Sequence, residues 1–232
     1  MRTAVAETPV IVAIDGPSGT GKSSTSKAVA DRLGLAFLDT GAQYRAMTWW
    51  MLANGVDTGD PAAVAAAAAK PVIVSGTDPL APTITVDGTD VAGPIREEAV
   101  TSAVSAVSAV PEVRTRITGL QRTIAAEAGA GIVVEGRDIG TTVLPDADVK
   151  IFLTASAEAR AARRSAELTG AAAADVAATR EALVRRDTAD SARKTSPLAK
   201  AADAVEVDTT HLTLEQVIER VVGLVNEKRH DR

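Results

Sequence analysis

A glycine-rich run near the start of the chain carries the residue types best suited to phosphate chemistry. Residues 16–23 read GPSGTGKS, which matches the pattern G-x-x-x-x-G-K-[ST]. Glycines let successive backbone N–H groups turn toward phosphate oxygens, and the N-terminus of the following helix adds its dipole. In such loops the lysine, here Lys22, reaches the β- and γ-phosphates, and the hydroxyl of Ser23 is a ligand for Mg²⁺. The run therefore predicts a nucleoside triphosphate site rather than a glycine turn without a ligand.

The rest of the chain favours a small-molecule kinase among proteins with such a loop. A GTPase needs N-K-x-D to recognise guanine, and the sequence has no such run. The D-x-x-G match at residues 90–93 is short and lies in a turn-rich stretch. A kinase must hold a second anion against the γ-phosphate, which requires cations. Arg45 and Arg137 each follow a predicted strand, where α/β sheets bind ligands.

The elements that position these residues alternate between strand and helix. A β-branched strand over 10–14 precedes the glycine loop, and helical spacing follows over 22–33, with Gly34 at the C-terminal cap. This order opens a parallel α/β sheet. Four further short strands are predicted at 35–38, 132–134, 149–153 and 204–207. Helices are predicted at 43–53, 95–110, 111–128, 156–169, 173–187 and 214–225, with an irregular stretch over 188–200.

Residues 60–95 differ in character and predict an inserted unit. Asp60 and Pro61 suit a helix start, and two segments at 72–74 and 83–86 alternate with a period of two. The pair Asp87-Gly88 is typical of a hairpin turn. We therefore predict a core over 9–59 and 96–228, with the small antiparallel unit inserted between its parts.

Composition narrows the class of protein and its partners. The 232 residues include five aromatic residues, two histidines and no cysteine, which disfavours base-stacking platforms, disulfides and thiolate metal sites. The formal net charge of −5 gives no broad attraction to nucleic acid or to anionic membranes. Residues 156–200 nevertheless hold nine basic and six acidic side chains, a local cationic patch suited to a small polyanion. With no apolar run long enough for a membrane span, we expect a cytoplasmic monomer that binds small molecules, without nucleic acid or membrane partners.

Four ordered motifs carry a resemblance to a known family. They are residues 14–24 (IDGPSGTGKSS), 38–45 (LDTGAQYR), 135–141 (EGRDIGT) and the segment from Arg186-Asp187 to Pro197-Leu198. Together these motifs resemble the bacterial cytidylate (CMP) kinase family from about residue 10 to residue 226. The resemblance implies an α/β P-loop kinase with a five-stranded parallel sheet flanked by helices, an inserted NMP-binding subdomain and a lid at about 156–172. It also implies that the enzyme transfers the γ-phosphoryl group of ATP, with Mg²⁺, to CMP or dCMP.

The resemblance also assigns roles to individual residues. It implies phosphate contacts from Arg45, Arg137 and Arg193, and contacts around cytosine from Ser105, Arg114 and Asp138. Arg186 and Asp190 correspond to residues near the sugar, Thr40 and Tyr44 to residues lining the acceptor pocket, and Arg160, Arg163 and Arg164 to the lid. The expected catalytic residues are Lys22, Arg137, Arg193 and Arg163, and the expected metal ligand is Ser23. The expected ATP contacts are Gly16, Pro17, Ser18, Gly19, Thr20, Gly21, Lys22, Ser23, Ser24 and Arg160.

Other interpretations stay open at this level. The acceptor could be UMP or a hydroxy acid such as shikimate, although shikimate-type kinases carry D-x-D where this chain has Asp39-Thr40-Gly41. A non-catalytic nucleotide sensor is a second alternative. Glu135 stands where many family members have Asp, and either Mg²⁺ binding or a contact to Arg137 would suit a carboxylate there. The lid arginines could instead form a solvated face that pairs with Glu158 and Glu167.

Overall fold

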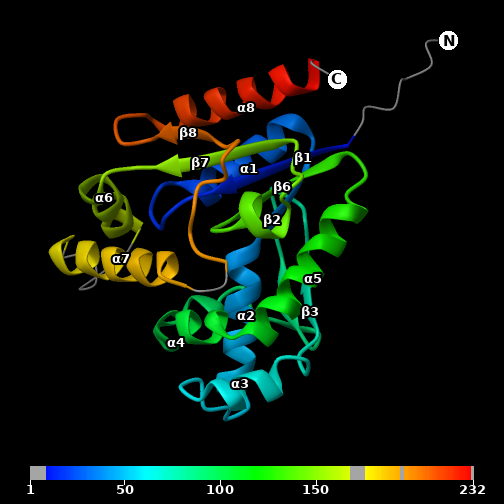
Figure 1. The fold of residues 1–232 in the computed structure, drawn as a ribbon, viewed down its shortest axis with the longest axis vertical. Helices are drawn as coiled ribbons and strands as arrows, with labels where there is room; N and C mark the ends of the chain where they lie inside the picture. The colour runs from blue at the N-terminus through cyan, green and yellow to red at the C-terminus, as the bar shows by residue number, and fades with distance from the viewer. Residues whose placement is uncertain (1–8, 168–175, 194–195, 231–232) are drawn as a thin grey trace.

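A five-stranded parallel sheet forms the centre of the molecule. In the computed structural model, which describes residues 9–167, 176–193 and 196–230, the strands lie in the order β2-β6-β1-β7-β8 (Figure 1). Val12 in β1 pairs with Val133 on one side and Val149 on the other, so β1 is the central strand. The strands are β1 (Val10–Asp15), β2 (Ala36–Asp39), β6 (Gly131–Gly136), β7 (Val149–Thr154) and β8 (Val205–Asp208). The predicted five-stranded parallel sheet is confirmed.

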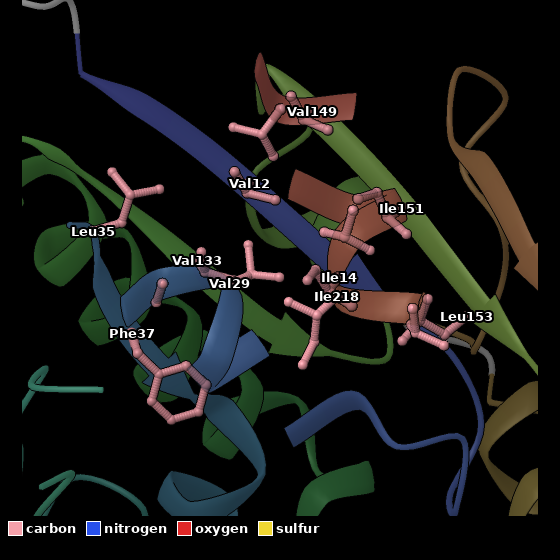
Figure 2. Packing of buried hydrophobic residues seen from close by; sticks show 14 of the residues in the cluster. Val12, Ile14, Val29, Leu35, Phe37, Val133, Val149, Ile151, Leu153 and Ile218 are labelled. Carbon is pink, nitrogen blue, oxygen red and sulfur yellow. The ribbon is translucent and has the colours of Figure 1, made fainter. Parts of the chain in front are cut away.

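Helices cover both faces of this sheet because its central strand, β1, is apolar on both sides. Val12 and Ile14 of β1 belong to a cluster that includes residues of α1 (Lys22–Leu33) and α8 (Leu214–His230), as Figure 2 shows. Ala13, between them, belongs to a second cluster that includes a residue of α5 (Pro111–Glu127). This alternation is the period of two expected for a strand buried on both faces. Because both faces of the strand are packed with apolar residues, the polar site lies at the carboxyl ends of the strands.

A second unit lies against this sheet and has its own apolar cluster. It contains α2 (Thr40–Ala53), α3 (Pro61–Ala67), the antiparallel strands β3 (Ile73–Ser75), β4 (Ile84–Val86) and β5 (Thr89–Asp90), a 3₁₀ turn (Pro94–Arg96) and α4 (Glu98–Ala109). Its cluster also draws on the N-terminal half of α5. The predicted hairpin is confirmed, because Asp87 and Gly88 both have positive φ, of 50° and 79°, as a two-residue turn of type I′ requires. Figure 1 shows this unit gathered at one end of the molecule, around α2.

Several predicted boundaries differ from the observed ones, and one observed element was not predicted. The helix expected over 95–110 is interrupted at Glu97, which has extended backbone angles, so α4 begins only at Glu98. The helix expected to end at 187 continues as α7 (Val176–Ser191), and a short π-helix over Ile139–Val143 was not expected. The remaining helix, α6 (Ala157–Glu167), covers the start of the predicted lid, whose residues 168–172 lie outside the described part. No helix of the described chain is both long and apolar enough to cross a membrane.

Candidate functional site

The glycine loop wraps tightly between the end of β1 and the start of α1. Gly16, Gly19 and Gly21 have φ angles of +145°, +79° and +86°, in the region that favours glycine. A Cβ atom on Gly16 would lie 2.2 Å from the Leu153 carbonyl oxygen, and one on Gly19 would lie 3.1 Å from the Cβ atom of Arg160. The loop therefore needs glycine both for its backbone conformation and for its close approach to β7 and α6. Helix α1 begins at Lys22, so its N-terminus points into the loop.

The lysine of the loop sits in a mixed charge environment. Its Nζ atom donates to the Pro17 carbonyl oxygen at 2.7 Å, which folds the side chain back over the loop. Burial, with Arg137 adding repulsion, lowers the pKa of Lys22 to about 7, while Glu135 and Asp15 act in the opposite direction. Phosphate oxygens near the ammonium group would favour its charged form. An anion bound in the loop would therefore raise the pKa of Lys22.

Glu135 and Ser23 offer oxygen ligands beside the lysine. Burial raises the pKa of Glu135 to about 8, with Asp39 adding to the rise and Lys22 and the Ser23 hydroxyl opposing it. Its Oε1 atom is buried without a hydrogen-bond partner. In the described ranges no three His, Cys, Asp or Glu side chains form a metal-binding group. Mg²⁺ typically takes one or two protein ligands and completes its shell with phosphates and water, so this small donor set fits that ion.

The acceptor side of the site contains a buried ion pair. Arg114 of α5 and Asp138, which follows β6, approach to 2.5 Å, and their side chains are only 5% and 7% exposed. Arg114 also donates to the Ser108 carbonyl oxygen at 3.2 Å, and its guanidinium carbon lies 5.4 Å from the centre of the Tyr44 ring. A buried pair of this kind holds both its donor and its acceptor in fixed positions. The α4 residue that contacts this group is Ser108, while the predicted Ser105 lies half-buried one turn earlier on the same helix.

A second carboxylate joins two arginines from distant parts of the chain. Asp190 of α7 forms ion pairs with Arg137 Nε at 2.9 Å and with Arg193 at 2.5 Å. Arg137 also donates to the Gly16 carbonyl oxygen at 2.6 Å, and Arg193 donates to the Ser108 hydroxyl at 3.1 Å. Arg137 therefore touches the glycine loop and the acceptor side at once.

Further arginines crowd this region. Burial lowers the pKa of Arg186 to about 10, and Arg137 and Arg45 add to the effect. Burial also lowers the pKa of Arg45, with Arg164, Arg96 and Arg137 adding to the effect against Asp39. Arg45 donates to Thr101 Oγ1 at 2.8 Å, whereas the buried Nε atom of Arg186 has no hydrogen-bond partner. So many guanidinium groups around few carboxylates make a site for an anion.

The predicted lid arginines contact the chain in different ways. Arg160 forms an ion pair with Asp187 and donates to the Ser18 carbonyl oxygen at 3.2 Å, while Asp187 accepts from the Ser18 N–H at 3.3 Å. Arg163 instead donates to the hydroxyl of Thr209 at 2.9 Å, and that hydroxyl lies 3.2 Å from the Thr20 carbonyl oxygen. Both arginines thus hold α6 against the glycine loop.

Sequence reasoning missed several residues of this network. Asp187, Thr209, Ser108 and Asp15 were given no role, although each contacts a predicted site residue or its loop. Asp15 and Asp187 did have a signal, since each lies within one of the four motifs, whereas Ser108 and Thr209 lie outside them. Among the other predicted residues, Thr40 donates a hydrogen bond from its hydroxyl group to the Glu135 carbonyl oxygen at 2.6 Å. Ser23 and Ser24 are exposed at the start of α1.

Comparison with known proteins shows which family this chain resembles over nearly its whole length. The family model of cytidylate kinase matches residues 12–227. The cytidylate kinase of Streptomyces coelicolor is 81% identical over 220 residues, which cover 95% of this chain and 94% of that protein. The cytidylate kinase of Streptomyces griseus is 77% identical over 224 residues, which cover 97% of this chain and 96% of that protein.

A solved structure shares the fold at low sequence identity. The crystal structure of an uncharacterized protein from Eubacterium ventriosum has a TM-score of 0.52 at 11% identity, and the likeness covers 95% of this chain and 99% of that one. This likeness concerns the fold alone. The family match and the near-complete relatives go further: the chain belongs to the cytidylate kinase family.

Proposed function

We propose that this enzyme transfers the γ-phosphoryl group of ATP to CMP or dCMP, giving ADP and CDP or dCDP. The observation that carries the proposal is the position of Arg137, which contacts Gly16 of the glycine loop and Asp190 of the arginine cluster. Under this proposal, one guanidinium group would lie between the triphosphate in the loop and the phosphate of the acceptor. This is the arrangement that two negatively charged reactants need in order to approach each other.

Base recognition rests on Asp138 and Arg114. Cytosine presents an amino donor at N4 and an acceptor at N3, whereas uracil presents an acceptor and a donor at the same positions. The carboxylate of Asp138 can accept from the amino group, and Arg114 can donate to N3. With uracil, the Asp138 carboxylate would face an acceptor and Arg114 would face a donor. Neither group could then form a hydrogen bond, and leaving buried polar groups unpaired costs binding free energy. Ser105 would add a hydroxyl near the base, and Tyr44 and Thr40 would line the pocket.

The sugar and the acceptor phosphate are assigned to the second carboxylate and the arginines around it. Asp190 can accept from a sugar hydroxyl while it continues to pair with Arg193, and Arg186 lies beside them. Arg45, Arg137 and Arg193 would hold the phosphate of the acceptor. The lowered pKa values of Arg45, Arg186 and Arg193, caused first by burial, indicate guanidinium groups that gain from a bound anion.

The transfer step needs alignment and charge neutralisation rather than a general base. An oxygen of the acceptor phosphate forms a bond to the γ-phosphorus of ATP, and the bond from that phosphorus to the β–γ bridging oxygen breaks. The acceptor is already anionic, so no proton has to be removed from it. Lys22 would stabilise the charge that develops on the β- and γ-oxygens, and Arg137 would do so on the acceptor side. Mg²⁺, which Ser23 and Glu135 would hold together with the phosphates, supplies further neutralisation when bound.

The lid and the inserted unit are assigned to closure over the reactants. We take residues 60–95 as the inserted NMP-binding unit and about 156–172 as the lid, with Arg160 and Arg163 closing over ATP and Arg164 beside Arg45. Closure would exclude water, which otherwise attacks the γ-phosphate. The enzyme is further expected to be a cytoplasmic monomer with small-molecule substrates and no nucleic acid or membrane partner.

The experiment that tests this proposal is a coupled assay of ADP release. Mg-ATP is supplied with CMP, dCMP, UMP, AMP, GMP or shikimate in turn. Strong turnover with CMP and dCMP and little with the others is the expected result. High turnover with UMP or shikimate would identify a different acceptor. Binding of ATP without turnover on any acceptor would point to a nucleotide sensor and overturn the proposal.

A further inference from the structure

The side chain of Asp15 connects the start of the phosphate loop to the π-helix that follows β6. Asp15 is the last residue of β1, directly before the first glycine of the phosphate loop, and it is 4% exposed. Its Oδ1 atom accepts from the Ile139 N–H, and its Oδ2 atom accepts from the Gly140 N–H, each at 2.8 Å. Both oxygens of one buried carboxylate are thus used on two consecutive amides of the π-helix.

The same residue also fixes the other end of that segment. Asp15 is the register partner of Gly136, the last residue of β6, in the parallel sheet. Arg137 and Asp138 therefore lie between two attachment points that both belong to Asp15, one through its backbone and one through its side chain.

The chemistry of the position favours a carboxylate over its neutral analogue. Two N–H donors need two acceptor oxygens, and an asparagine would offer one oxygen and turn an amino group toward the second N–H. Burial raises the pKa of Asp15 to about 6, with the charge of Asp138 adding to the rise and Lys22 opposing it. The segment is also closely packed, since a Cβ atom on Gly140 would lie 3.5 Å from Asp15 Oδ2 and 3.2 Å from Lys150. A buried charge that costs stability is kept here, next to the residues that face the acceptor.

We propose that Asp15 is a positioning residue that sets Arg137 and Asp138 in place relative to the phosphate loop. The inference rests on the proposed function for the roles of those two residues. Asp15 itself touches neither reactant. Removing its charge would leave the glycine loop intact and would displace the residues on the acceptor side. The effect should therefore appear in the use of CMP and in the choice between CMP and UMP rather than in the affinity for ATP.

The chain offers a matched control on the same strand. Asp148 Oδ2 accepts from the Ile11 N–H at 2.7 Å, so it is also a carboxylate bonded to a backbone amide, but at the opposite end of β1. We would compare Asp15→Asn and Asp148→Asn with the parent enzyme by steady-state kinetics with CMP and with UMP. Hydrogen exchange of the peptide covering 136–143 would be measured for each, along with the melting temperature.

The expected result for Asp15→Asn is a loss of about 30-fold or more in kcat/KM for CMP, with KM for ATP changed less than about threefold. The preference for CMP over UMP should narrow, and exchange over 136–143 should accelerate. Asp148→Asn should leave all these quantities close to the parent values, even where its melting temperature falls. If Asp15→Asn does not fold, Asp15→Glu, which keeps the charge and moves it by one methylene, should show the same split between the substrates.

Two results would overturn the inference. One is an Asp15→Asn variant with parent-like kinetics and exchange. The other is an equal rise of KM for ATP and CMP with the base preference unchanged, which a merely structural role would produce. A parent enzyme without CMP turnover would instead contradict the proposed function. Hydrogen exchange would then still report whether Asp15 holds the 136–143 segment.

Discussion

One half of the site is formed mainly by backbone groups, and the other half is formed by side chains. The donor half is a continuous run of backbone at residues 16–23, shaped by three glycines with positive φ and closed by the start of one helix. The acceptor half is a set of side chains from separate elements, in which Asp138 pairs with Arg114 and Asp190 pairs with Arg137 and Arg193. A backbone site depends on local sequence, whereas a side-chain site depends on the whole fold.

This difference implies that substitutions in the two halves should have different effects on ligand binding and on the choice of base. Backbone amides bind any triphosphate in much the same way, so the donor half supplies binding and charge. The paired side chains of the acceptor half have fixed directions, so under the proposed function that half would supply the choice of base and the alignment of the acceptor. Arg137, which contacts Gly16 and Asp190, is the point where the two halves meet.

The largest effect is expected from the one side chain that the donor half contributes directly to charge neutralisation. Lys22→Ala should lower kcat by about 1,000-fold or more, because the ammonium group that lies over the phosphate loop is lost. The affinity for CMP, measured by calorimetry, should stay within a few-fold of the parent value. Lys27→Ala, on the same helix but over the Phe37 ring, is the control and should keep nearly full turnover. More than a tenth of parent activity in Lys22→Ala would contradict the assignment.

At the junction between the halves, Arg137→Ala should lower kcat by about 100-fold or more while the affinity for ATP changes little. The reason is that the guanidinium group offsets repulsion between the two reactants, whereas the loop amides still hold the triphosphate. Coupled-assay kinetics and calorimetry with a non-hydrolysable ATP analogue check both parts. A collapse of ATP affinity with high residual turnover would show that the residue serves the donor half instead.

The buried carboxylate that ties the halves together should make stability depend on pH. The folded-state pKa of Asp15 is raised from 3.8 to about 6, so the folded protein binds this proton more tightly than the unfolded chain does. The contribution of Asp15 to the free energy of unfolding should therefore be greatest below about pH 4 and be lost as the pH rises through about 6. The full difference amounts to about 3 kcal/mol.

Urea denaturation of the parent and of Asp15→Asn between pH 4 and 7.5 measures this contribution. The parent should gain stability relative to the variant as the pH falls, since the variant has no group to protonate there. The neighbouring charges of Asp138 and Lys22 are present in both proteins and largely cancel in the comparison. A difference that stays constant over this range would exclude the shifted titration.

A smaller effect is expected on the choice of base. Asp138→Asn keeps the volume of the side chain and one acceptor oxygen for Arg114, but it removes the charge. The ratio of kcat/KM for CMP to that for UMP should fall about tenfold, the cost of one imperfectly paired polar group. Asp203→Asn, which alters the solvent-exposed partner of Lys150, is the control. An unchanged ratio in Asp138→Asn would remove this residue from base recognition.

The smallest effects are expected for substitutions of two acidic residues of α7, which should differ in their consequences for ATP binding. Asp187→Asn should raise KM for ATP several-fold, because Arg160 loses the carboxylate that holds it against the Ser18 carbonyl oxygen. Glu181→Gln breaks only an exposed pair with Arg185 and should leave turnover and melting temperature unchanged. Equal behaviour of the two variants would show that the contact to the loop has no part in ATP binding.

The sheet could be predicted because its strands carry a strong local signal. The apolar runs in β1 and β6 are buried on both faces, and β7 alternates between buried and half-buried residues. The loop glycines follow directly after β1. The extra turn of α7 could not be predicted, since residues 188–191 are small or polar and Asp190 is held there by Arg137 and Arg193. The π-helix at 139–143 likewise depends on the Asp15 carboxylate from another strand.

The same contrast applies to the site. The donor loop is visible as one motif, and the arginines of the acceptor half come from motifs that resemble a family. The partners that orient them carry no such signal: Ser108 sits one turn after the predicted Ser105, and Thr209 is a single hydroxyl after β8. Such residues act through contacts of more than 80 positions in sequence separation, which only the folded chain reveals.

The division between a backbone donor half and a side-chain acceptor half is tested most directly by calorimetry on Arg193→Gln. Arg193 contacts Asp190 and Ser108, on the acceptor side. CMP and a non-hydrolysable ATP analogue would be titrated separately into the parent and the variant. We predict that the affinity for CMP falls about tenfold or more while the affinity for the analogue stays within about twofold. Equal weakening of both ligands would contradict the division.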